Sequence, residues 1–82
     1  MRITYDEPKR EWTLKERGLD FAGLTVEFFE TAAIFPAKQG RWIAINWFRG
    51  VAILAVIFRP LGTEAISVIS MRRASRKERD LL

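Results

Sequence analysis

Residues 65–79 read AISVISMRRASRKER, and this stretch best indicates the fold. Its first part, residues 65–73, is rich in β-branched side chains, as is typical of a buried strand. Its end, residues 72–79, contains five basic residues, at positions 72, 73, 76, 77 and 79. Ser75 and Glu78 have the spacing of a capping box, which predicts a short helix that begins near Ser75. The stretch therefore predicts a strand that holds positive charge at one edge of a sheet.

The rest of the chain is divided by turn residues and by changes in hydrophobic period. A strand is expected at 3–5. Asp6 and Gly18 delimit a helix at 7–17, and Asp20 caps a second helix at 21–29. Three further strands are predicted, at 31–35, 41–48 and 51–58, with turns at 38–40, 49–50 and 60–63. We predict one α+β domain, residues 1–82, in which the two N-terminal helices pack on an antiparallel β-meander and a short helix follows.

Two apolar features bear on the core. Residues 51–58 are apolar at nearly every position, which indicates a central strand covered on both faces. The three tryptophans and six phenylalanines are expected mostly in the core, although an exposed aromatic ring can also stack on a nucleobase. If one face of a strand is left uncovered, its aromatic residues would instead provide a surface for a protein partner.

The composition limits the chemistry. The 82 residues contain no cysteine and no histidine, which excludes disulfides, thiolate metal sites, cysteine nucleophiles and histidine-based acid–base catalysis. We therefore expect no metal and no cofactor. No apolar segment approaches the ~18 residues that a membrane helix needs, and the start does not resemble a signal peptide. A cytoplasmic protein without membrane contact is expected.

Charge is distributed unevenly along the chain. The formal net charge is +4, and residues 42–82 carry all of it, because the acidic and basic residues of 1–41 balance. Such an asymmetry favours a polyanionic partner such as nucleic acid. The alternative, a basic tail that is simply solvated, remains open on charge alone.

Several motifs together resemble the BrnT toxins, the ribonuclease components of BrnT–BrnA type II toxin–antitoxin pairs. The motifs are YDEPKR at 5–10, KERGLDFA at 15–22, RWIAI at 41–45, LGTEA at 61–65 and, most specifically, ISMRRASRKER at 69–79. The resemblance implies a RelE-like fold with a curved sheet and metal-independent RNA cleavage. It also implies a tight heterocomplex with a BrnA-like antitoxin, as a dimer of heterodimers that contacts DNA only through the antitoxin. One departure is clear, since many members have Lys-His-Gly where this chain has Glu16-Arg17-Gly18.

RNA can be cleaved without a metal when its 2′-hydroxyl attacks the adjacent phosphate. Positive charge then stabilises the phosphorane, and arginine suits this task because its planar fork binds phosphate bidentately. Arg72 matches the family's basic block and is the first candidate; a surface residue at the sheet edge is the alternative. Glu78 is a candidate base or a residue that orients an arginine, but it also fits the capping box. Glu30, at the end of the second predicted helix, is the other carboxylate candidate.

The remaining cations are candidates for binding the RNA backbone. Arg73 should point to the opposite face of the strand from Arg72, because neighbours in a strand alternate. Arg76 and Arg79 are three residues apart and share one helix face. Arg41 opens a strand and is expected on the sheet face near the site. For each, a solvated surface residue is the competing interpretation.

Two other functions fit the same residues. One is a non-catalytic module that binds RNA or a protein partner through the basic edge. The other is a degenerate toxin that keeps only its antitoxin interface, an alternative that the missing helix-end histidine keeps open.

Overall fold

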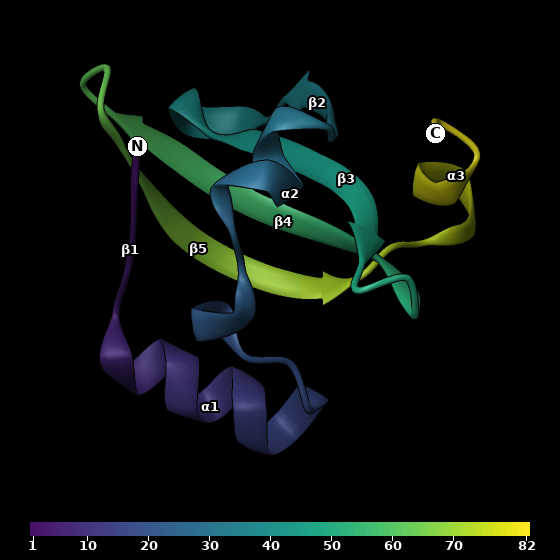
Figure 1. The fold of residues 1–82 in the computed structure, drawn as a ribbon, viewed down its shortest axis with the longest axis horizontal. Coiled ribbons are helices and arrows are strands. Elements are labelled where there is room, and N and C mark those ends of the chain that lie inside the picture. The colour runs from purple at the N-terminus through teal and green to yellow at the C-terminus, as the bar shows by residue number, and fades with distance from the viewer.

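The computed structural model describes residues 1–82, and its centre is a five-stranded sheet. The strand order is β1-β5-β4-β3-β2. The strands are β1 (Arg2–Tyr5), β2 (Ala33–Pro36), β3 (Trp42–Phe48), β4 (Ala52–Leu61) and β5 (Ala65–Arg73). The helices are α1 (Glu7–Arg17), α2 (Val26–Glu30) and α3 (Arg76–Arg79), with two short 3-10 turns, η1 (Phe21–Gly23) and η2 (Lys38–Gly40). Figure 1 shows the sheet strongly twisted, with α1 below it and α3 beside one end. None of the helices has both the length and the apolar composition that crossing a membrane requires.

The predicted meander is correct for β2 to β5, which pair antiparallel in chain order, but not for β1. β1 runs parallel to β5 and pairs with it from Arg2 opposite Ala65 to Tyr5 opposite Val68. The sheet is therefore mixed. Because β1 ends at Tyr5, the second half of β5 has no strand on its outer side, and α1 lies along that edge instead (Figure 1).

The predicted second helix at 21–29 is also corrected. The chain forms the turn η1, leaves helical geometry at Leu24, and starts α2 only at Val26. The side chain of Thr25 accepts a hydrogen bond from the backbone N–H of Phe28, and this cap begins the new helix. Both pieces still contribute to the core, because Phe21, Leu24 and Phe28 are buried as predicted.

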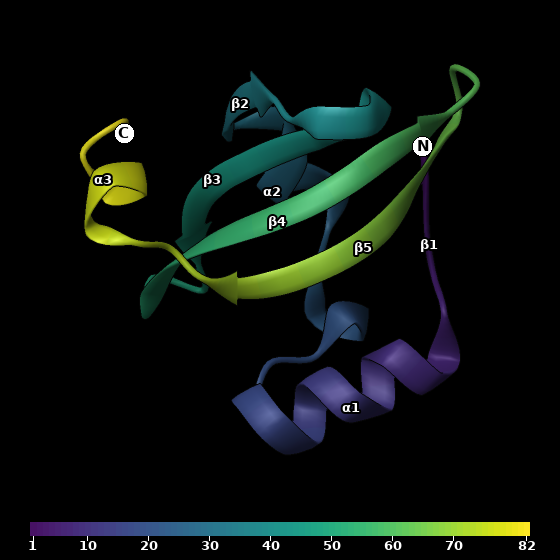
Figure 2. The same cartoon turned by 180° about the vertical axis from the view of Figure 1, so that it is seen from behind.

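The sheet has two different faces. One face, which we call the helix face, packs against η1 and α2, and its buried side chains are Ala44, Leu54, Val56, Phe58, Ile66, Val68 and Met71. The other face, which we call the open face, has no helix across it and only α3 at one end (Figure 2). It carries a smaller apolar cluster centred on Ile45, Ala55 and Ala74. The prediction that residues 51–58 are covered on both faces holds for the centre of β4, where Leu54, Ala55 and Val56 are fully buried, but not for Val51, which is 81% exposed in the turn before the strand.

A β-bulge in β5 decides which side chains reach each face. Ile57 pairs with Ser70 and the next residue, Phe58, pairs with Val68, so Ile69 is an extra residue in β5. Val68 and Met71 consequently both point to the helix face, although they are three residues apart. The same shift places Ser70 and Arg72 on the open face, opposite Ile57 and Ala55.

Two turn predictions differ from the structure. The β3–β4 hairpin connects through residues 49–51, with Arg49 and Gly50 both at positive φ, so its loop is one residue longer than predicted. Pro60 belongs to β4 and not to the turn. Because β3 begins at Trp42, opposite Phe58, it does not reach Pro60, and at Pro60 β4 has only β5 as a neighbour. A strand with a neighbour on one side only tolerates proline.

The prediction that most of the tryptophans and phenylalanines lie in the core holds for the phenylalanines and fails for the tryptophans. Trp12, Trp42 and Trp47 are 53%, 38% and 54% exposed. Trp12 lies on α1, and the other two lie near the two ends of β3, where no element covers them. The phenylalanines behave as expected: four are buried and two are half-buried against the core.

Candidate functional site

Arg72 projects from the open face at the end of β5 that carries the chain into α3. Its neighbours across the sheet are Ala55 of β4 and, one strand further, Ile45 of β3. Both neighbours are small or apolar, so Arg72 is the charged group in this row of the sheet. The side chain is 35% exposed, which leaves the guanidinium in contact with solvent.

Glu78 of α3 holds the guanidinium of Arg72 in a two-pronged ion pair. Nη1 of Arg72 lies 2.6 Å from Oε1 of Glu78, and Nη2 lies 2.9 Å from Oε2. Hydrogen bonds from Arg72 lower the pKa of Glu78 to about 2, with the backbone N–H of Ser75 adding to the effect. The same pairing raises the pKa of Arg72 above its usual value. Such a fork-to-fork pair fixes both the position and the orientation of the arginine.

Glu78 also closes the predicted capping box. Its Oε1 accepts a hydrogen bond from the backbone N–H of Ser75 at 2.8 Å, and its own N–H donates to Oγ of Ser75 at 3.2 Å. The two interpretations of Glu78, as a helix cap and as a residue that orients an arginine, are therefore compatible, because one carboxylate does both. A carboxylate with a pKa of about 2 is a weak base at neutral pH, so this geometry suits an orienting role better than proton abstraction.

Arg72 keeps hydrogen-bonding capacity beyond its partner. A guanidinium has five N–H donors. Three are directed at protein acceptors, two at Glu78 and one, at 3.4 Å, at the backbone carbonyl of Arg73. Two donors therefore remain for a solvent-side acceptor. A phosphate oxygen is the kind of acceptor that such a partly exposed, oriented arginine binds well.

Arg73 pairs with Leu54, so it leaves β5 on the helix face, opposite to Arg72 as predicted, and it is joined at the end of the sheet by Arg79 of α3. They line a shallow cavity of about 230 Å³, which we call the Trp47 cavity, with Trp47, Val51, Ala52, Ile53 and Ala74. Neither arginine forms a salt bridge, since all three salt bridges in the structure involve Arg10 or Arg72. Two unpaired cations beside a half-exposed indole are suited to bind a nucleic-acid backbone and a base.

Trp47 is the residue that the sequence analysis missed, because an aromatic residue in a strand was assigned to the core. A signal was present: Trp47 lies two residues before the turn at Arg49-Gly50. A side chain so near the end of a strand extends past the elements that cover the sheet centre.

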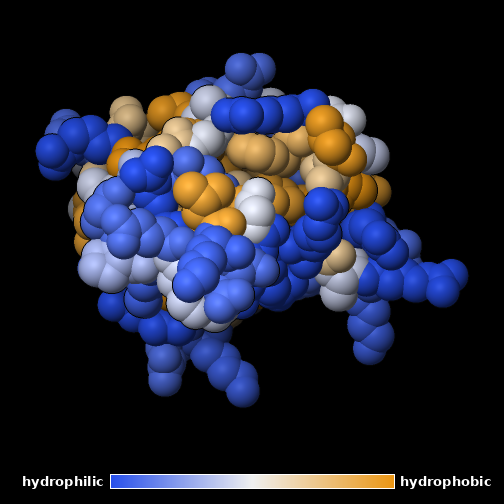
Figure 3. Space-filling model, turned by 90° about the horizontal axis from the view of Figure 1, so that it is seen from below, coloured by the Kyte–Doolittle hydropathy of each residue, from blue (hydrophilic) through white to orange (hydrophobic).

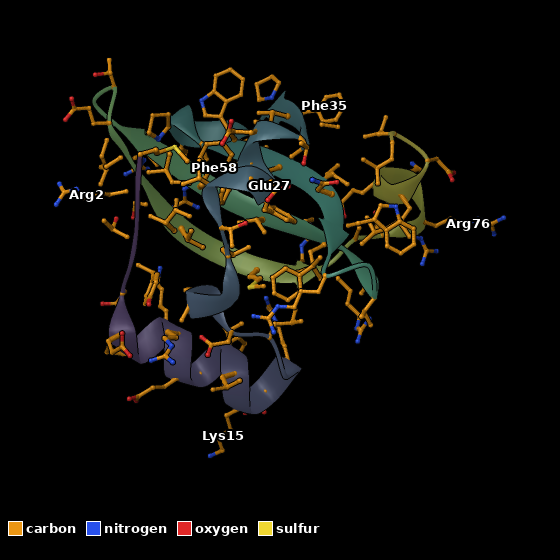
Figure 4. The ribbon with its side chains drawn as sticks, viewed as in Figure 1. Arg2, Lys15, Glu27, Phe35, Phe58 and Arg76 are labelled. Carbon is orange, nitrogen blue, oxygen red and sulfur yellow. The ribbon has the colours of Figure 1, made fainter.

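The other predicted residues do not join this group. Arg76 is exposed and extends outward from α3, away from the sheet (Figure 4). Glu30 is exposed at the end of α2, which packs on the helix face, so the sheet separates it from Arg72. Arg41 precedes β3, four residues before Ile45, which places it about 13 Å along the strand from the row of Arg72.

Comparison with known proteins agrees with this architecture. A sequence model of the family described as "Ribonuclease toxin, BrnT, of type II toxin-antitoxin system" matches residues 5–78. The 1.1 Å crystal structure of the Brucella abortus ribonuclease toxin BrnT is similar over 93% of this chain and 99% of that chain, with a TM-score of 0.86 and 55% identity. No protein with curated annotation matches the sequence significantly. The matched region spans every strand from β2 to β5 and the capping box. The chain therefore belongs to the family of BrnT ribonuclease toxins of type II toxin–antitoxin systems.

Proposed function

We propose that the protein cleaves RNA on the open face of its sheet, with Arg72 stabilising the phosphate that reacts. The observation that carries this proposal is the pairing of Arg72 with Glu78, because it holds a partly exposed guanidinium in one orientation while two of its donors stay free. Arg73 and Arg79 would bind the flanking backbone. Membership of a ribonuclease toxin family supports the same activity.

In the proposed reaction, the 2′-oxygen of one nucleotide forms a bond to its own 3′-phosphorus. The bond from that phosphorus to the 5′-oxygen of the next nucleotide breaks. The 2′-hydroxyl loses its proton and the departing 5′-oxygen gains one, so the products are a 2′,3′-cyclic phosphate and a 5′-hydroxyl. Negative charge grows on the non-bridging oxygens in the transition state, and a preoriented guanidinium stabilises that charge.

Glu78 is a positioning residue in this proposal. Its low pKa keeps it ionised at neutral pH, and its two oxygens keep the arginine fork from rotating. Because the same carboxylate caps α3, the order of the C-terminal helix and the orientation of Arg72 are coupled. Glu30 has no role in this reaction, because it lies on the other side of the sheet.

The reaction products test the proposal. Purified protein should cleave a single-stranded RNA in the presence of EDTA and leave 2′,3′-cyclic phosphate ends, which mass spectrometry identifies. The same sequence made of DNA should stay intact, because it lacks the nucleophile. Cleavage that requires an added divalent metal, or products with 5′-phosphates, would contradict the proposed chemistry.

A type II toxin has a protein antitoxin as its partner. We propose that this partner is BrnA-like, that the complex is a dimer of heterodimers in the cytoplasm, and that only the antitoxin contacts DNA. The support is the sequence resemblance over nearly the whole chain. Co-expression with the neighbouring open reading frame, followed by light scattering on the purified complex, would measure the stoichiometry directly.

A further inference from the structure

A second cavity lies on the other side of β5 from the Trp47 cavity, between α1 and the strand edge that β1 leaves unpaired. Its volume is about 330 Å³, and we call it the Trp12 cavity. The lining residues are Pro8, Lys9, Trp12, Thr13, Arg17, Ile69 and Ser70. None of them is acidic, and a cavity at the low end of the range for small-molecule sites suits a group of nucleotide size better than a folded element of a protein.

Arg17 is held in place over the aromatic ring of this cavity. Its guanidinium carbon lies 5.1 Å from the centre of the Trp12 ring. Nη1 of Arg17 donates a hydrogen bond to the backbone carbonyl of Met71 at 3.0 Å and lies 3.5 Å from Oγ of Ser70. No carboxylate forms a salt bridge with Arg17 or with Lys9. The positive charges of Lys9 and Arg17 are therefore not neutralised by a carboxylate. Arg17 is also held in place by the Trp12 ring and by the edge of β5.

The Trp12 cavity lies beside Arg72 along β5, although Arg72 is not part of its lining. Ser70, in the cavity wall, and Arg72 are two residues apart on the same face of β5, because the bulge at Ile69 precedes both. Residues two apart in a strand are separated by about 7 Å. A nucleotide bound in the cavity would therefore adjoin a phosphate at Arg72. Seen from below, hydrophilic side chains cover much of the α1 side, with apolar areas between them (Figure 3).

We propose that the Trp12 cavity binds one nucleotide of the RNA strand that is cleaved at Arg72, with the base against the Trp12 ring and its phosphate between Lys9 and Arg17. The inference rests on the proposed function, since it assigns the neighbouring phosphate to Arg72. The charge of the lining and its nearness to Arg72 along β5 argue for RNA as the occupant, because the lining holds two cations, an exposed indole and no acid. An acidic segment of a protein partner is the competing occupant, and the experiment below separates the two.

The test measures binding of a 2′-O-methyl oligonucleotide of about eight mixed bases by fluorescence anisotropy. This strand lacks the nucleophilic hydroxyl, so binding is measured whether or not the protein cleaves RNA. Trp12→Ala should raise the Kd about tenfold, because stacking on an aromatic ring is lost. Trp12→Phe should recover most of that loss. Trp42→Ala is the matched control, since Trp42 is also exposed but lies near the far end of β3 on the helix face, and it should bind like the wild type.

Arg17→Met is an independent test of the positive charge, because it removes the charge of Arg17 and keeps an apolar side chain against Trp12. It should weaken oligonucleotide binding and reduce the salt dependence, while Arg17→Lys should keep most of that dependence. The proposal is overturned if Trp12→Ala binds the oligonucleotide like the wild type, or loses no more affinity than Trp42→Ala. It is also overturned if Trp12→Ala weakens binding of the antitoxin and leaves oligonucleotide binding unchanged. Cleavage of unmodified RNA is assayed in parallel, so loss of the proposed ribonuclease activity would be recognised separately.

Discussion

Glu78 accepts hydrogen bonds from both Nη atoms of Arg72 and, with the same carboxylate, from the backbone N–H of Ser75. One side chain thus joins the end of β5 to the first turn of α3. The arginine that the basic block of the sequence brings to the sheet edge is not a freely moving cation. Its orientation depends on a helix of four residues, and that helix depends on its cap.

The low pKa of Glu78 predicts a specific pH dependence of stability. The folded-state pKa is about 2, below the value of about 4.3 for an unperturbed glutamate. A group with a lowered pKa adds stability above its unfolded pKa, and this contribution is lost as the pH falls toward the folded pKa. At neutral pH, Glu78→Gln should therefore lower the free energy of unfolding by about 1.5–3 kcal/mol. The difference between the two proteins should shrink between about pH 4.5 and pH 2, measured by urea unfolding.

Glu64→Gln is a suitable control for this prediction, because Glu64 is exposed in the β4–β5 turn and forms no salt bridge. It should change the stability little at neutral pH. If Glu78→Gln were as stable as Glu64→Gln, the ion pair with Arg72 would not contribute to the folded state as described.

The bulge at Ile69 predicts unequal costs for two neighbouring substitutions. Met71 is fully buried on the helix face, so Met71→Ala should lower the free energy of unfolding by about 2–5 kcal/mol. Ile69 is the extra residue and only partly buried, and Ile69→Ala should cost clearly less. Thermal or urea unfolding measures both. A larger loss for Ile69→Ala than for Met71→Ala would mean that the register of β5 is different.

Arg73 and Arg79 should act on RNA affinity through charge alone. Each contact to a single-stranded backbone changes the slope of log affinity against log salt by about 0.7. We therefore expect Arg73→Ala and Arg79→Ala each to reduce that slope by about this amount, with little dependence on the RNA sequence. Lys15→Ala removes one charge from α1 on a side chain that points away from the molecule (Figure 4) and should leave the slope unchanged. Equal slopes for all four proteins would exclude the Trp47 cavity as part of the RNA path.

The strand at 65–73 was predicted with its observed bounds, and so was the capping box, because both are local patterns of β-branched and capping residues. The bulge was not predictable. Strict alternation from Ile66 and Val68 would send Arg72 to the buried face, and only the pairing with β4 shows that Ile69 is inserted. The parallel pairing of β1 escaped prediction for a similar reason, since it joins residues more than sixty positions apart and has no local signature.

The candidate site was predicted in part. Arg72 and Glu78 were named from the sequence, and they are in contact because the turn through Ala74 brings α3 back to the sheet. Trp47 was missed, since the sequence shows that a residue is aromatic but not that its strand end is uncovered. Likewise, no local pattern brings Arg17 to the edge of β5, 54 residues away.

We propose that Arg72, oriented by Glu78 on the open face, stabilises the reacting phosphate. The most direct measurement is kcat/KM for cleavage of one defined RNA by the wild type, Arg72→Ala and the matched control Arg2→Ala, whose arginine is exposed on β1 (Figure 4). We predict a loss of about 100-fold or more for Arg72→Ala and wild-type activity for Arg2→Ala, with both variants folded by circular dichroism. Cleavage by folded Arg72→Ala at the wild-type rate would contradict the claim.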